Sequence, residues 1–248
     1  MWSSLYQDYW WVVWIGGGIV ALVVGWFLLC LLTARFERRH IRRLIPLEDE
    51  QGPASRSSTA AEIADAALPL GFFYVGAFRD GESNILKAQL DMYLSGDGKV
   101  MLVIPSMTAM LGYRLLTRTT EDVWLMSSEM SSGTDQSGLH LARFLPGCTF
   151  PQVLRYHHDR IDSYPADVVP FDPETLVDVM LEHDRLRAER AVELGLSRWV
   201  SYEQDSHTSS WRGAFKLARQ MFFMGKALSQ ANQLAEYYKS GADGPTGP

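Results

Sequence analysis

Residues 11–34 read WVVWIGGGIVALVVGWFLLCLLTA and contain no charged side chain. A helix needs roughly 20 apolar residues to cross the hydrocarbon core of a bilayer, and this stretch supplies them. It is followed at once by RFERRHIRR at residues 35–43. We therefore expect one membrane-spanning helix over residues 11–34, with a short outer segment at residues 1–10.

The basic residues around this helix lie on one side only. Five arginines follow it, and no Lys or Arg precedes it. Because an excess of Lys and Arg marks the cytoplasmic flank, we expect the N-terminus outside and the soluble domain in the cytoplasm, anchored in a bacterial cytoplasmic (inner) membrane. A cleaved signal peptide is the alternative, but it carries its basic residues before the apolar run. The residues expected to anchor the helix at the two membrane interfaces are Trp10, Trp11, Trp14, Arg35, Arg38, Arg39, Arg42 and Arg43.

Small residues recur along one face of the expected helix. Gly17, Ala21 and Gly25 are spaced four residues apart, so they lie on the same side. Small residues at this spacing let two helix backbones approach closely in lipid. The row predicts pairing with an integral membrane protein or with a second copy of the chain, although glycine is also simply frequent in membrane helices.

The chain beyond the membrane helix is acidic. The whole chain has a formal net charge of −6, and residues 1–43 carry five arginines against Asp8 and Glu37. The remainder is therefore more negative than the whole. An acidic domain argues against general nucleic-acid binding. The two cysteines, Cys30 and Cys148, provide no disulfide framework, which agrees with a reducing compartment.

Strand-like patterns come first in the soluble part, and helix-like patterns follow. Residues 71–130 contain about five strand candidates separated by polar turns, and ILKAQLDMYL at residues 85–94 alternates cleanly. The order predicts an α+β fold for residues 71–239, in which C-terminal helices pack on an antiparallel meander sheet of about five strands. Residues 35–70 would form the basic stop and linker, and residues 240–248 a disordered tail.

Three helices are expected after the sheet. Thr149 can cap the first, with Pro151 in its first turn. Asp172 and Pro173 begin the second, which ends near Gly195. The third runs from Ser209 or Ser210 to about Lys239.

Two histidines on the first two helices are the only candidates for metal or acid/base chemistry. His157 and His183 fall among apolar residues of their helices, and packing of the two helices could bring both imidazoles together with nearby acids. The spacing is not that of a metal pair on one helix, as in H-E-x-x-H, and ordinary buried or solvated histidines are the favoured interpretation. We therefore assign no catalytic, cofactor or metal-binding residue.

The third helix has two distinct stripes. Trp211, Phe215 and Phe222 lie on one, and the cations Arg212, Lys216 and Arg219 lie beside them. The favoured interpretation is an ordinary amphipathic helix, which would place the aromatic stripe in the core. A helix that lies on the bilayer surface or on a partner would expose it.

These patterns predict a single-pass membrane protein that contacts membrane lipid and acts by protein–protein interaction, as an accessory or assembly subunit of a membrane complex. A membrane-tethered ligand-binding or sensor domain is the alternative, with the meander sheet enclosing a small molecule. A tethered enzyme built on His157 and His183 is the third possibility. No motif identifies a cofactor, and non-enzymatic function is favoured.

Overall fold

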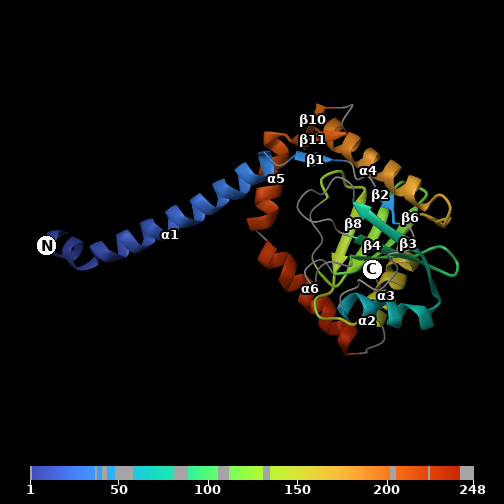
Figure 1. The fold of residues 1–248 in the computed structure, drawn as a ribbon. Helices are drawn as coiled ribbons and strands as arrows, with labels where there is room; N and C mark the ends of the chain where they lie inside the picture. Colours follow the sequence, from blue (N-terminus) through green and yellow to red (C-terminus); the bar gives the residue numbers. More distant parts are fainter. Residues whose placement is uncertain are drawn as a thin grey trace.

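The computed structural model describes residues 2–36, 38–40, 44–47, 58–80, 89–105, 112–130, 135–201, 205–222 and 224–240. Helix α1, Trp2–Phe36, projects away from the rest of the molecule (Figure 1). Its segment Trp14–Phe36 is 23 residues long and apolar enough to span a membrane, and only 6% of the most apolar stretch of this segment is buried. Arg42, Arg43 and the expected tail from residue 241 onward lie outside the described residues.

The soluble domain is built on an eight-stranded, mostly antiparallel sheet. Seven of its strands follow the order β2-β3-β4-β5-β6-β7-β8. Their bounds are β2 Leu44–Pro46, β3 Phe72–Asp80, β4 Gln89–Ser95, β5 Met101–Pro105, β6 Arg114–Thr119, β7 Trp124–Ser128 and β8 His140–Phe144. The mixed α+β content is confirmed, whereas the prediction of about five strands is wrong.

The additional strands lie at the margins of the sheet. β2 falls within the expected linker and pairs with β3. β8 runs parallel to β7, and its residues are half-buried or exposed, so they lack the apolar run of a central strand. The two-residue strand β9, Val168–Val169, pairs with the end of β6. Short edge strands of this kind carry too few residues for a clear period.

Alternate residues of the central strands face two separate cores, because successive side chains point to opposite sides of a sheet. Leu102 and Ile104 face one core, and Met101 and Val103 face the other. Helices α2, Ser58–Ala67, and α3, Phe150–Ser163, cover the first core. Helix α4, Leu176–Glu193, covers the second. The two helices that carry His157 and His183 therefore lie on opposite faces of the sheet.

The helix termini follow local capping chemistry. Thr149 precedes α3, and its backbone N–H donates to Gln152 Oε1 at 2.9 Å. The expected start of α4 at Pro173 is wrong by three residues. Asp172 instead forms a turn in which its Oδ1 accepts from the Glu174 N–H at 3.0 Å. Gly195 adopts a φ of +67° just after α4, as expected of a helix-ending glycine.

A second, three-stranded sheet begins directly after α1. Its order is β1-β11-β10, with bounds β1 Arg38–His40, β11 Ser206–Ser209 and β10 Ser197–Ser201. The predicted third helix is two helices, α5 at Trp211–Phe222 and α6 at Met224–Lys239. Figure 1 shows α5 and α6 along the side of the domain that faces the projecting α1.

Candidate functional site

The domain end of the long apolar helix α1 packs against α5. The rings of Phe27 and Phe215 lie 5.7 Å apart between centroids, and those of Phe36 and Trp211 lie 6.5 Å apart, both edge to face. Between them, Leu31 and a small cluster of buried apolar residues close the contact. We call this contact of Phe27–Phe36 with α5 the membrane junction.

Arg35 lies inside the membrane junction and is largely buried. Its guanidinium carbon is 5.3 Å from the Trp211 ring centroid and 5.6 Å from that of Phe36. Its carbonyl oxygen accepts from Thr208 Oγ1 at 2.8 Å. The Arg35 side chain, which was expected to anchor the helix at the lipid surface, therefore contacts α5. The Arg35 backbone is bonded to β11. Cation–π contacts of this kind are stronger when desolvated.

The two faces of α5 differ from those of an ordinary amphipathic helix. Ala214, Leu217 and Ala218 are buried against α1 and the domain, whereas Trp211 is 56% exposed and Phe215 54% exposed. The aromatic stripe therefore does not lie in the core, and the interpretation of these two residues as core is wrong. Phe222 is on the same helix, and its side chain is outside what the structure describes. The exposed stripe agrees with a surface that meets lipid or a partner.

Gly213 seats α5 on the domain. A Cβ added at this residue would overlap the Leu196 carbonyl oxygen and lie 2.7 Å from its carbonyl carbon. Ser210 caps the helix here, since its Oγ accepts from the Gly213 N–H at 3.0 Å and donates to the Gly195 carbonyl at 2.6 Å. Glycine is required because no side chain fits between the two backbones.

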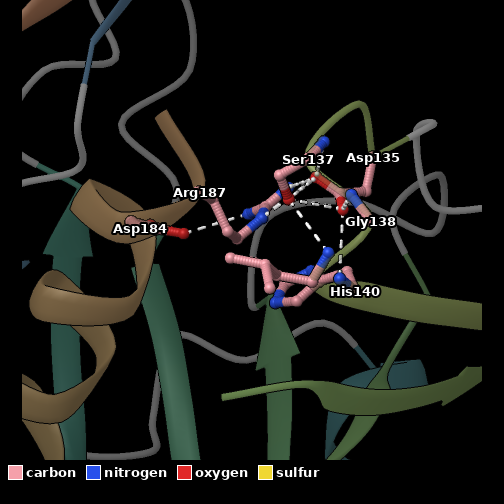
Figure 2. Close-up of polar contacts among 7 residues, drawn as sticks. Asp135, Ser137, Gly138, His140, Asp184 and Arg187 are labelled. Carbon is pink, nitrogen blue, oxygen red and sulfur yellow. Dashed lines mark hydrogen bonds and ion pairs between the residues drawn. The ribbon is translucent and has the colours of Figure 1, made fainter. Parts of the chain in front are cut away.

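A buried carboxylate, Asp135, organises residues 135–140 at the start of β8, next to α5. Figure 2 shows Asp135 surrounded by donors from the loop and from α4. Its Oδ2 accepts from the backbone N–H groups of Gly138 at 2.8 Å and His140 at 3.0 Å. Its Oδ1 accepts from Nε and Nη2 of Arg187, at 3.2 and 3.0 Å. Charge-assisted hydrogen bonds of this kind are stronger than hydrogen bonds between neutral groups.

The charge balance of this cluster keeps the carboxylate ionised. Burial by itself would raise the pKa of Asp135, but the Arg187 guanidinium and the hydrogen bonds from His140 and Ser137 outweigh it and lower the pKa to about 2. The neighbouring Gln136 then donates from Nε2 to the Gly213 carbonyl at 2.9 Å. The cluster thus fixes the loop that holds the start of α5.

His157 is held as a neutral ring inside the first core. Its Nε2 lies 3.0 Å from Thr117 Oγ1, and its Nδ1 lies 2.8 Å from Ser127 Oγ. Thr117 Oγ1 donates its hydrogen to the Lys99 carbonyl oxygen at 2.9 Å, so it must accept a hydrogen bond from His157 Nε2–H. Nδ1 of His157 then accepts a hydrogen bond from the Ser127 hydroxyl. Burial, with Arg160 nearby, lowers the pKa of His157 well below its ordinary value. Both ring nitrogens are occupied by structural hydrogen bonds.

His183 lies on the other face of the sheet and belongs to a stack of rings. Its centroid is 4.2 Å from that of Trp124, at an interplanar angle of 14°, and 4.9 Å from that of His140. The expectation that His157 and His183 could share a site is therefore wrong, because the sheet separates them. Within the described part of the chain, no group of three or more His, Cys, Asp or Glu side chains could hold a metal ion.

We predict that the domain loses stability as the pH falls from 6.5 towards 5. Burial first, and Arg187 second, lower the pKa of His183 to about 4, whereas an unfolded histidine has a pKa of about 6.5. Between these values only the unfolded state binds the proton, so acidification favours unfolding, by about 2 kcal/mol at pH 5 for this one group.

The measurement is denaturant unfolding of the protein in non-ionic detergent at pH 5, 6 and 7. His183→Phe keeps a stacked ring without a titrating group and should show a weaker pH dependence. His158→Phe, at an exposed position of α3, is the matched control for removing one histidine. An undiminished pH dependence in His183→Phe would contradict the assignment.

The remaining predicted site residues lie on the projecting part of α1. A Cβ at Gly17 or Gly25 would meet nothing within 4 Å, and Ala21 is exposed, so the row of small residues is uncovered in the single chain. Trp14 is exposed near the start of the span. The side chains of Trp10 and Trp11, and those of Arg38 and Arg39 in β1, lie outside what the structure describes.

Sequence reasoning missed the membrane junction, Gly213 and the Asp135 cluster. Gly213 within the aromatic and basic run WRGAFK is the one signal that could have been found, since a glycine inside a helix commonly marks close approach. No family model, curated protein or solved structure matched the chain.

Proposed function

We propose that the protein is a single-pass accessory or assembly subunit of a membrane complex, with its N-terminus outside and its soluble domain in the cytoplasm of a bacterial cell. In this function, α1 selects an integral membrane partner through its Gly17, Ala21 and Gly25 face. The soluble domain acts by binding protein on the inner side. The support from the structure is one helix, Trp14–Phe36, that is long and apolar enough to span a membrane.

The observation that carries the proposal is the membrane junction. A tether alone would need only a flexible connection, whereas α1 here contacts α5 over Phe27–Phe36 and is bonded to β11 through Arg35. Because β1 follows one residue after α1 and pairs with β11, the helix is joined to the domain at two places. A contact made by α1 in the bilayer would therefore orient the whole domain.

The α1 surface beyond the junction supports the same proposal. Its side chains are exposed in the single chain, from Trp14 to Leu29 with few exceptions. In lipid, van der Waals packing between small residues drives helix association. The Gly17 face is the part of α1 where a partner helix could approach most closely.

The test is the identity of proteins that remain bound after gentle extraction from the host membrane. We expect stoichiometric partners with the wild-type chain, and their loss with Gly17→Leu, because leucine would keep the two backbones apart. Gly16→Leu is the matched control, since residue 16 lies on a different side of the helix. A chain that migrates alone in mild detergent would contradict the proposal.

A further inference from the structure

An open cavity of about 420 Å³ lies beside α5, at the side of the domain that carries the membrane helix. It is lined by Leu194 and Leu196, which follow α4, and by Arg212, Phe215, Lys216 and Arg219 of α5. It lies away from both cores of the main sheet. The volume is in the usual range for small-molecule sites, roughly 300–1,000 Å³.

The polar part of this lining is entirely cationic. Arg212, Lys216 and Arg219 are spaced four and three residues apart, so their side chains are neighbours on one face of α5. All three are exposed, and none forms an ion pair with another residue in the portion of the chain that the structure describes. Arg212 lies in the first turn of α5, which holds no acidic residue, so the positive end of the helix dipole adds to the field at Arg212. The ligand class that this field favours is an anion.

The apolar part of the lining is continuous with the membrane junction. Phe215 contributes to the cavity and also contacts Phe27 of α1. Phe27 precedes the end of the spanning segment at Phe36 by nine residues, or about 13 Å along a helix. If Trp14–Phe36 crosses the bilayer, Phe215 contacts α1 at the depth of the acyl chains, and Arg212, next to the Trp211 that contacts Phe36, lies near the headgroups.

We propose that this cavity binds the phosphate headgroup of an anionic phospholipid in the leaflet on the side of the soluble domain. Arg212, Lys216 and Arg219 hold the phosphate, and Phe215, Leu194 and Leu196 contact the adjoining acyl chain. An acidic protein segment would match the charges but gives no reason for the aromatic stripe beside a membrane helix. The proposal rests on α1 spanning the bilayer, which is part of the proposed function, and not on the partner subunit.

The experiment is native mass spectrometry of the full-length protein released from detergent after equilibration with phosphatidylglycerol or phosphatidylcholine of the same acyl chains. We expect preferential retention of phosphatidylglycerol by the wild type. The variant Arg212→Gln, Lys216→Gln, Arg219→Gln should lose about tenfold or more of this preference, since each basic residue near an anionic surface contributes to binding. Inorganic phosphate at millimolar concentration should displace little of the lipid, because it lacks the acyl contacts.

The matched control is Arg143→Gln, Arg155→Gln, Arg185→Gln, which removes the same charge from exposed positions outside the cavity. It should retain the lipid as the wild type does, and thermal unfolding should show that both variants are folded. Equal retention of the two lipids, equal loss in both variants, or displacement by phosphate alone would overturn the site. Co-purified partners are read in the same spectra, so failure of the lipid site and failure of the subunit proposal are distinguishable.

Discussion

Replacing Gly213 by alanine is expected to separate α5 from the soluble domain. Alanine normally favours a helix over glycine by about 1 kcal/mol. Here its Cβ would overlap the Leu196 carbonyl, a backbone group that cannot rotate away. Overpacking typically costs 1–3 kcal/mol and occasionally more, and we expect the upper end here because the overlap is with backbone atoms. After the gain in helix propensity, the net loss should be about 2 kcal/mol, or α5 should be released locally.

Two measurements check this result. Denaturant unfolding gives the loss in the free energy of unfolding, and limited trypsin digestion reports cleavage after Lys216 or Arg219 once α5 is released. Gly96→Ala is the matched control, since an added Cβ there meets only the Gly71 carbonyl oxygen at 3.6 Å, an ordinary contact. Wild-type stability and protease resistance in Gly213→Ala would show that α5 is not seated as described.

Asp135→Ala is expected to be the most destabilising single substitution of a polar side chain. It removes the shared acceptor of three backbone N–H groups, of the Ser137 hydroxyl and of Arg187. The Arg187 guanidinium then retains its 3.0 Å ion pair with Asp184. Breaking a buried pair by removing one partner costs about 3–5 kcal/mol. We expect a loss near the lower end, because Arg187 retains that second partner.

The control is Asp205→Ala, which breaks a 2.8 Å ion pair with the half-exposed Arg185. Pairs of this exposed kind contribute about 0–1 kcal/mol. The comparison is made by urea unfolding of both variants at pH 7. Because the pKa of Asp135 is lowered to about 2, the stability it provides should persist to pH 4 and disappear as the pH falls towards 2. Equal losses in the two variants would contradict the role of Asp135.

The long apolar helix α1 and the central strands could be predicted from the sequence because each carries a strong local signal. Residues 11–34 are uncharged over the length of a bilayer, and Met101–Pro105 is an unbroken apolar run. Thr149 and Pro151 mark the start of α3 in the same local way. Such features depend on neighbours a few residues apart, so one sequence suffices to identify them.

The membrane junction could not be predicted, because it joins residues nearly 190 positions apart. Phe27 lies within the expected span with no local signal of a contact to the domain, and the stripe of Trp211 and Phe215 was expected in the core. The answer depends on where α5 meets α1. The His157 and His183 hypothesis failed for a similar reason. Only the pairing order of the sheet decides that α3 and α4 cover opposite faces.

The most direct test of the account is whether Phe27 of the membrane helix and Phe215 of α5 are neighbours in the intact protein. Both are replaced by cysteine in a chain with Cys30→Ala and Cys148→Ala, and a short bifunctional thiol reagent is applied to native membranes. We expect rapid intramolecular crosslinking, since the two rings lie 5.7 Å apart, and much less with Ile19→Cys paired to Phe215→Cys. Absence of the Phe27–Phe215 crosslink, with both cysteines accessible to a single-ended reagent, would contradict the membrane junction.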